Sequence, residues 1–576
     1  MNFKKVNISN FLRTQCCLLV FFAFFNSSSA QFYKKYLPKL PSLKLPVKEK
    51  INGNKFFDSQ RISKYVKDSI LNKSQAMPMA VGYTDFDENL RDLKLLGIIQ
   101  TENSLTIRPY ITRSTLPYDS ILKYIDTSIH NHGHIKQTKH LDIQLLPINI
   151  LQKYNSKRPY GWNDGPLSFS KGYQTLISGG VYLRWYNFHL NIRPEFFKTA
   201  SDSYEHSGFW GQVTPSLSKI IWGQSDLRMD LGPISIGIAN QNIWRGPGYY
   251  SSLLMSNNAQ GFKHYYFNTN RPLKTPLGSF ELSVLGGTLT QNKTQGFENK
   301  NLFTADVSEN TRYINMLTLT YSPVFFKNLY LGANRVFHQF SVTTPSTNFK
   351  KDYLPVLLPL FRNVYQDNAE AIDQLISGFI KYSFPKEHAE LYFEYGWNDG
   401  KSNARDLNLD NSHSSASILG FKKLFEIKNK QYIGIEAEAT RMAQTPSFLL
   451  RNAGNWYEHF QIKSGYTNEN QILGAGSGFG NNVQTISATW NSGWTKYGIK
   501  FQRIEQQPRR FVSTGADVYL GDTDWNDYCY GFVVKQRYKK ILLNAQIEWV
   551  HSKNYLWQEN KQLGNLYFFL NTIYIW

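Results

Sequence analysis

The feature that most constrains the fold is a two-residue alternation of apolar and polar side chains, which begins near His140 and continues to the end of the chain. It is clearest in three runs, at residues 389–397, 432–440 and 541–549. Successive side chains of a strand point to opposite faces, so these runs predict strands with one apolar face and one face of carboxylates and amides. A sandwich and a barrel both alternate in this way, so the pattern alone does not separate them.

The spacing of the turns separates the two architectures. Short turns are predicted near residues 186–187, 232–233, 323–327, 385–388, 428–430, 491–493 and 538–540. Long connections are predicted at residues 151–173, 199–220, 291–311, 342–374, 398–415, 443–456, 507–527 and 552–562. Tight turns at one rim and long loops at the other are typical of an outer-membrane barrel. The last run, Leu566–Trp576, ends on an aromatic residue and resembles the signal that barrel-insertion machinery recognises.

We therefore predict an all-β fold, a large antiparallel transmembrane β-barrel with an N-terminal helical segment that plugs it. About twenty candidate strands can be counted, an even number, as both termini in the periplasm require. The mean hydropathy of −0.42 and the absence of a run of roughly 18 apolar residues beyond the N-terminus exclude membrane-spanning helices. Aromatic residues make up 15% of the chain, which suits a barrel with aromatic girdles.

The N-terminus predicts export. Residues 1–30 combine a basic start, an apolar stretch and small residues before Gln31, which is the pattern of a signal peptide. Its removal leaves Cys529 as the one cysteine, so no intramolecular disulfide can form. Residues 31–135 are predicted to form an extended lead and a helical periplasmic segment, with one helix starting near Asp85 and ending at Gly97 and a second starting near Pro117. The barrel is predicted to span residues 136–576.

The charge balance indicates the kind of partner. The formal net charge is +21, and it falls to +18 when Lys4, Lys5 and Arg13 leave with the signal peptide. In an exported protein this excess favours anionic polysaccharide or lipopolysaccharide, whereas nucleic acid would be the usual partner inside a cell. Solvation of long loops explains the charge equally well.

The segment Asn242–Gly287 carries the most specific motifs. It contains Trp244-Arg245-Gly246-Pro247-Gly248, then Asn257-Asn258, then Arg271-Pro272. Gly-Pro-Gly interrupts both helix and ladder, which predicts an ordered loop that folds back between two strands. These motifs resemble the signature of the capsule assembly Wzi family of outer-membrane β-barrels, and a weaker match extends from about Thr84 to Trp576. The resemblance implies eighteen strands, so one hairpin is overcounted, near 471–480 or 261–270. It also implies N-terminal helices that close the periplasmic mouth.

The function implied by this resemblance is lectin-like surface attachment and assembly of capsular or other extracellular polysaccharide. Partners would be that anionic polymer, lipopolysaccharide with outer-membrane lipid, and barrel-insertion machinery. No enzyme activity and no cofactor are predicted, because no nucleophile elbow, phosphate loop or zinc-helix motif occurs. One alternative is a channel for oligosaccharides or other solutes, which needs an open lumen. Another is an outer-membrane hydrolase, which needs a Ser–His or carboxylate pair at the rim.

The hexamer Tyr-Gly-Trp-Asn-Asp-Gly occurs twice, at residues 160–165 and 395–400. The turn pattern places both copies where a strand enters an outer loop. Trp162 and Trp397 can stack on sugar rings while the following Asn and Asp bind hydroxyls. The structural alternative, which we favour for both copies, is a turn sequence beside a girdle tryptophan.

Aromatic and basic residues of the outer loops form further candidate binding groups. They are Arg451 and Trp456 in one loop, and Arg509, Arg510, Trp525 and Tyr528 in another. Arginine binds carboxylates with two parallel hydrogen bonds, which suits uronic-acid polymers, and lipopolysaccharide phosphates are an equally good partner.

Two further sets of residues have structural interpretations. Arg245 and Arg271 can neutralise inward carboxylates such as Glu281 while their loop fills the lumen, or the segment can form a saccharide platform. We favour the structural interpretation. His130, His132 and His134 alternate as on a strand, but no Cys or acidic residue nearby completes a tetrahedral set, so no metal site is predicted.

Overall fold

The structure is a computed structural model, and the chain divides into two units, Met1–Ser69 and Ile70–Trp576. The described residues all belong to the second unit, and they are residues 81–82, 86–99, 101–110, 133–200, 217–291, 311–340, 354–357, 372–398, 410, 412–427, 431–443, 456–459, 462, 464–507 and 523–576. The signal peptide, the extended lead, the second helix, His130 and His132 lie outside these ranges, so the expectations about them stay predictions.

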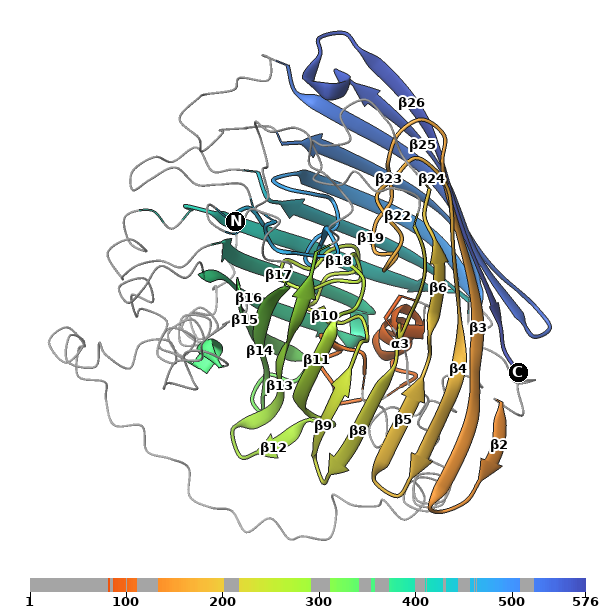
Figure 1. Ribbon diagram of the computed structural model, residues 1–576, viewed down its shortest axis with the longest axis vertical. Helices are drawn as coiled ribbons and strands as arrows, with labels where there is room; N and C mark the ends of the chain where they lie inside the picture. The colour runs from red at the N-terminus through yellow and green to blue at the C-terminus, as the bar shows by residue number, and fades with distance from the viewer. Residues whose placement is uncertain are drawn as a thin grey trace, which may run out of the picture. The chain divides into compact units, whose positions relative to one another are not determined.

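The second unit is a closed antiparallel β-barrel (Figure 1). Its strands are β3 (Leu141–Asn155), β4 (Gly172–Trp185), β5 (Phe188–Ile192) with β6 (Glu195–Lys198), β7 (Ser218–Ile221) with β8 (Asp226–Leu231), β9 (Ile234–Ala239), β11 (Lys263–Thr269) with β12 (Leu273–Thr275), β13 (Gly278–Thr290), β14 (Thr311–Pro323), β15 (Leu329–Phe340), β16 (Ile372–Phe384), β17 (Ala389–Asn398), β18 (Ser415–Glu426), β19 (Gln431–Arg441), β22 (Asn482–Ser492), β23 (Thr495–Gln506), β24 (Trp525–Tyr538), β25 (Ile541–Lys553) and β26 (Gln562–Tyr574). Pairing of β26 with β3 closes the ring.

The described strands form eighteen wall segments when each interrupted strand is counted once. The count of about twenty was therefore too high by one hairpin. Residues 261–270 supply a wall strand, β11, whereas β20 (Thr467–Asn468) and β21 (Gln471–Ile472) form a separate two-stranded ribbon. The hairpin suspected near residues 471–480 was therefore the overcounted one.

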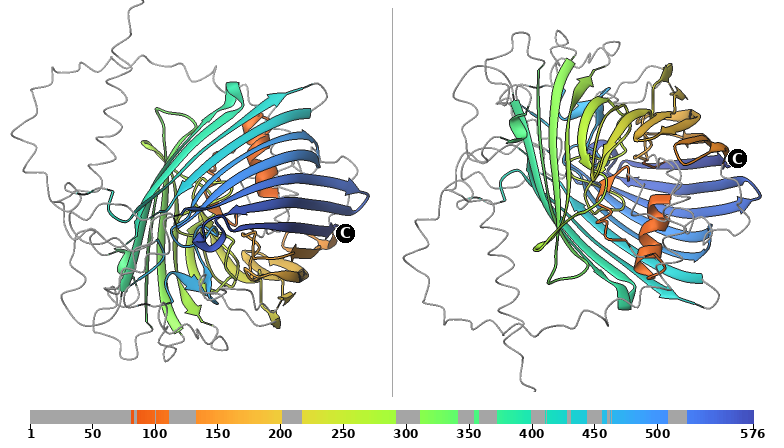
Figure 2. Two further views of the ribbon diagram at one scale, coloured as in Figure 1. Left: turned by 90° about the horizontal axis from the view of Figure 1, so that it is seen from above. Right: turned by 90° about the horizontal axis from the view of Figure 1, so that it is seen from below.

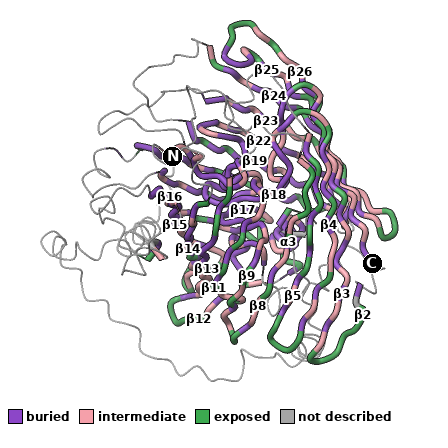
Figure 3. Tube along the Cα trace, in the orientation of Figure 1, coloured by how far each residue is buried: buried purple, intermediate pink, exposed green. Residues whose placement is uncertain are grey.

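The alternation of the sequence becomes an outer and an inner surface of the barrel. Leu391 and Phe393 are exposed, while Tyr392 and Glu394 between them are buried. Glu436 and Glu438 are only 6% and 4% exposed. Buried and exposed positions alternate along the strands in this way around the ring (Figure 3). An apolar outer face and an enclosed polar face are what a bilayer-spanning barrel requires, so the barrel prediction is confirmed.

The short turns gather at one rim, as predicted. Two residues connect β4 to β5, β8 to β9, β22 to β23 and β24 to β25. Tyr186, Gly232, Gly493 and Lys539 in these turns have positive φ, which matches the right-handed twist of the flanking strands. The opposite rim carries the long connections, and several of them lie outside the described residues.

A short helix, α3 (Phe86–Leu95), lies inside the ring of strands (Figure 2). Gly97 follows it with φ of +71°, so the predicted left-handed helix end is correct. Leu90 and Leu93 on one side of α3 pack in a cluster with Trp494, Leu542, Ile573 and Ile575 of the wall and C-terminus. No helix within the described ranges is long and apolar enough to cross a membrane.

The remaining short elements complete the described structure. β1 (Ile107–Arg108) pairs with β10 (Trp244–Arg245), and β2 (His134–Gln137) pairs with the start of β3. Three single-turn 3-10 helices are η3 (Pro355–Leu357), η5 (Pro385–Glu387) and η6 (Tyr555–Trp557). The β1–β10 ribbon joins the segment after α3 to the Gly-Pro-Gly loop, so these two stretches form one unit, called the plug below (residues 86–110 and 242–258).

Candidate functional site

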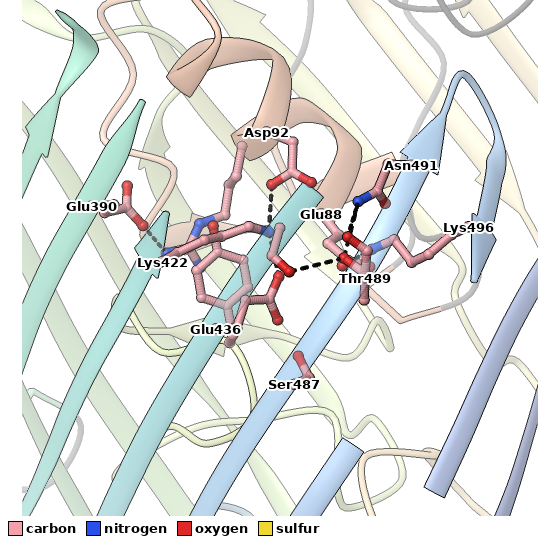
Figure 4. Close-up of polar contacts among 12 residues, drawn as sticks. Glu88, Asp92, Glu390, Lys422, Glu436, Ser487, Thr489, Asn491 and Lys496 are labelled. Carbon is pink, nitrogen blue, oxygen red and sulfur yellow. Dashed lines mark hydrogen bonds and ion pairs between the residues drawn. The ribbon is translucent and has the colours of Figure 1, made fainter. Parts of the chain in front are cut away.

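The polar side of α3 is joined to the barrel wall by ion pairs (Figure 4). Glu88 pairs with Lys496 of β23 and with Lys535 of β24, the second at 2.7 Å. Arg91 pairs with Glu390 of β17 at 2.5 Å. Asp92 pairs with Lys422 of β18, whose Nζ also lies 2.6 Å from Glu436. Spacings of three and four residues put these three side chains on one side of the helix. A ten-residue helix therefore contacts two separate pairs of neighbouring wall strands, β17–β18 and β23–β24.

The surroundings of these groups decide their ionisation. Burial by itself would raise the pKa of Glu88, but Lys496 and Lys535 outweigh burial and hold the pKa well below its usual value. Burial raises the pKa of Asp92 above its usual value, although Lys422 opposes this change. Burial would lower the pKa of Arg91, yet Glu390 more than compensates and raises it. Glu88 and Arg91 therefore remain charged at neutral pH.

The Gly-Pro-Gly loop folds back into the lumen, as predicted, and α3 holds it there. Arg91 donates to the carbonyl of Pro247 at 2.8 Å and to that of Gly248 at 3.3 Å. Gly246 has φ of +140°, and its N–H donates to the carbonyl of Thr106 at 2.9 Å. A Cβ on Gly246 would lie 3.0 Å from Glu394 Oε2, so glycine is required for both its conformation and its close contacts.

The predicted partners of Arg245 and Arg271 are wrong. Arg245 is buried, but it donates to the carbonyls of Arg108 and Trp244 and to the Ser283 hydroxyl. Glu281 instead accepts from the backbone N–H of Ser104 at 3.0 Å. Arg271 is exposed between β11 and β12. Backbone carbonyls, which no residue pattern reveals, replaced the carboxylates that the sequence suggested.

The two asparagines of the motif connect loops. Asn257 donates to the carbonyl of Asn163 at 2.8 Å and accepts from Asn242 at 2.6 Å. Asn258 donates to the carbonyl of Ile472 at 2.9 Å. Their hydrogen bonds therefore join the plug to the loop at 160–165 and to the β20–β21 ribbon.

The first copy of the hexamer, residues 160–165, turns into the lumen. Tyr160 is buried and its hydroxyl donates to Glu548 at 2.8 Å and Gln502 at 2.9 Å. Asp164 forms a buried ion pair with Lys153 at 2.5 Å. Arg158, just before the hexamer, pairs with Asp527 at 2.6 Å. Trp162 is half-buried and lines the cavity described below.

The described part of the second copy, residues 395–398, remains in the wall. Trp397 belongs to β17 and shares its outward face with Leu391 and Phe393. Its ring meets Tyr395 edge-on, with 5.0 Å between the ring centroids. This position is that of a girdle tryptophan, which agrees with the structural alternative for this copy.

The other candidate binding residues are not brought together. Trp456 and Trp525 are each 1% exposed, and their indole N–H groups bond to Ser414 and Asp527. Tyr528 lies on the opposite side of β24 from Trp525, with Lys553 above its ring. Neither tryptophan can therefore stack on a sugar at the surface in this structure. Arg451, Arg509 and Arg510 lie outside the described residues.

A cavity of about 310 Å³ lies between the plug, the first hexamer copy and the wall strands β19 and β22–β26. Lys496, Lys500 and Lys535 line it, together with Trp162 and several hydroxyl and amide side chains. These lysines were missed in the sequence. Their signal was present, because they share the inward faces of β23 and β24 with polar residues such as Gln502, Gln506 and Asp527. Within the described ranges, no group of three His, Cys, Asp or Glu side chains is arranged to hold a metal ion.

Comparison with known proteins finds a matching protein family. Residues 188–563 match the family model of the capsule assembly protein Wzi. A solved structure of the outer-membrane protein Wzi from Escherichia coli, described as a carbohydrate-binding β-barrel involved in group 1 capsule assembly, matches with a TM-score of 0.59 and 11% identity over 86% of this chain and 99% of that one. OpdL from Pseudomonas aeruginosa matches with a TM-score of 0.37 and 9% identity over 76% of this chain and 99% of that one. No protein with curated annotation matches the sequence.

Proposed function

The chain belongs to the Wzi family of capsule assembly proteins, and we propose that it attaches and assembles capsular or other extracellular polysaccharide at the outer membrane. The barrel itself supplies the anchor, because its outer face is apolar and its polar groups are enclosed. The polymer would be held by weak contacts repeated along its length, whose combined strength greatly exceeds that of one contact. No chemical change to the sugar is proposed.

The observation that carries this proposal is the filled lumen. Helix α3 and the Gly-Pro-Gly loop occupy the barrel, and ion pairs join the helix to β17, β18, β23 and β24. A channel for free diffusion needs an open path, and breaking such buried pairs costs about 3–5 kcal/mol each. The channel alternative is therefore disfavoured, and a holding role suits a barrel that does not conduct.

Outer loops remain the proposed polymer-binding surface. Arg451, Arg509 and Arg510 stay candidates for carboxylates of an anionic polymer. Lipopolysaccharide and the barrel-insertion machinery stay proposed partners of the barrel. Trp456 and Trp525 are not part of this surface, because both side chains are buried.

A deletion strain tests the proposal. Cells without the protein should make normal amounts of polysaccharide but shed it into the medium, and a plasmid copy should restore retention. The purified barrel should show no steady conductance in planar bilayers. Unchanged retention in the deletion strain, together with impaired solute uptake and a conducting barrel, would support the channel instead.

A further inference from the structure

The cavity between the plug and the wall has the chemistry of a ligand site. Its volume of about 310 Å³ is at the lower end of the range of small-molecule pockets. Hydroxyl and amide side chains reach it from β22, β23 and β25, namely Ser487, Thr489, Gln502, Asn544 and Gln546. Asn544, Gln546 and Lys500 are only partly buried, so solvent reaches the cavity.

Aromatic rings line the same space. Trp162 of the first hexamer copy and Tyr250 of the plug both border the cavity, and Tyr567 and Phe569 of β26 complete this side. An aromatic surface beside hydroxyl and amide groups is the combination that binds a sugar ring, which has apolar C–H faces and hydroxyls around its edge.

Two buried polar atoms of cavity-lining residues lack partners. Among the described residues, nothing bonds to the indole Nε1 of Trp244 or to Oδ1 of Asn163. The first atom is a donor and the second an acceptor, and each leaves a hydrogen bond unmade inside the protein. Both atoms are shielded from the open space of the cavity in this structure, so a polyhydroxyl ligand would bond to them only after the two side chains shift.

Each of the three lysines that line the cavity already has a carboxylate partner. Lys496 and Lys535 pair with Glu88, and Lys500 pairs with Glu548 at 2.6 Å. An anionic ligand would compete with Glu88 and Glu548 for these lysines and would meet their carboxylates at close range. The cavity therefore favours an uncharged ligand over a uronic acid.

We propose that this cavity binds one uncharged hexose unit of a glycan, with Trp162 as the stacking surface. The inference rests on the proposed function, because that function supplies a sugar polymer as the source of the unit. It adds a second kind of contact to those of the outer loops, one that recognises a neutral sugar.

Binding of simple sugars to the full-length barrel in detergent tests this site. D-glucose, D-galactose and their uronates would be titrated by calorimetry and by saturation-transfer NMR. We expect saturable binding of at least one neutral hexose, at least tenfold tighter than that of its uronate. Absence of saturable binding by both hexoses, or a preference for the uronate, would overturn the proposal.

Matched variants locate the binding. Asn544→Trp fills the cavity, and its control Leu543→Trp adds the same ring on the outward face of β25. Trp162→Ala removes the stacking surface, and its control Trp397→Ala removes the equivalent tryptophan of the second hexamer. Each cavity variant should weaken hexose binding at least tenfold and each control less than twofold, and equal effects in both members of a pair would refute the location. If Asn544→Trp does not fold, the tryptophan pair decides.

Binding of the intact polymer, measured on the same preparations, separates the two proposals. A barrel that binds the polymer but no hexose keeps the proposed function and overturns the cavity site. A barrel that binds hexose in the cavity but no polymer supports the site and counts against the proposed function.

Discussion

The two copies of Tyr-Gly-Trp-Asn-Asp-Gly have one sequence and two structures. The first copy lies beyond the end of β3, Gly161 has φ of +87°, and Tyr160 and Asp164 are buried. In the second copy Gly396 stays extended and pairs with Ser377 and Ala416, so Trp397 remains on the outward face. The difference lies in the partners: inside the barrel, Lys153 pairs with Asp164, and Gln502 and Glu548 contact the Tyr160 hydroxyl of the first copy. The same local sequence therefore allows more than one conformation, and contacts with residues far away in the chain decide which one forms.

The largest expected effect is on the ion pair that holds the first copy. Asp164→Ala leaves Lys153 charged and buried without its partner, so we expect the free energy of unfolding to fall by about 3–5 kcal/mol. Urea unfolding in detergent measures this change. The double variant Lys153→Met/Asp164→Leu removes both charges and should recover most of the loss. No recovery would mean that the pair is not what holds the loop.

A smaller effect is expected at the first tyrosine of each copy. Tyr160→Phe removes the one buried proton that the Glu548 carboxylate and the Gln502 carbonyl share, and should destabilise the barrel by about 1–3 kcal/mol. Tyr395→Phe keeps the ring contacts with Phe393 and Trp397 and changes a position on the outer face of β17, so it should cost less than Tyr160→Phe. Equal losses in the same unfolding assay would erase the distinction between the copies.

The smallest effect concerns the tryptophans themselves. Brominated lipids quench indoles that face the bilayer, so Trp397→Phe should reduce the quenchable fluorescence of the reconstituted barrel, and Trp162→Phe should leave it unchanged. The change is small because the chain holds 13 tryptophans. A reduction caused by Trp162→Phe would place the first copy outside the lumen.

The plug offers a test that does not depend on either copy. Because the folded-state pKa of Glu88 is depressed, its contribution to stability is present above the unfolded pKa of about 4.3 and is lost as pH falls through the folded pKa. We therefore expect protease protection of residues 86–110 to persist at pH 4 and to fail only in stronger acid. Glu88→Gln should remove this acid step, and loss of protection in the wild type near pH 5 would contradict the assignment.

The wall was predictable and the lumen was not. Alternation in strands such as β17, β19 and β25 follows from one apolar neighbour, the lipid, so each strand reports its orientation by itself. Helix α3 and its end at Gly97 were also readable, because local spacing and a glycine define them. The partners of Arg245 were not, because they are backbone carbonyls of residues far away in the chain. Burial of Trp456 was missed because a loop sequence does not reveal which way the loop folds, and burial of Trp525 was missed because β24 begins at this residue, which was assigned to a loop.

Helix α3 also implies an order of assembly. It precedes every wall strand in the sequence, yet Lys422, Lys496 and Lys535, which hold its carboxylates, belong to β18, β23 and β24. Although α3 is synthesised before the wall strands, it can form these ion pairs only after the later strands have been made and have joined the barrel. The helix can therefore form its full set of ion pairs only after β17, β18, β23 and β24 have joined the barrel.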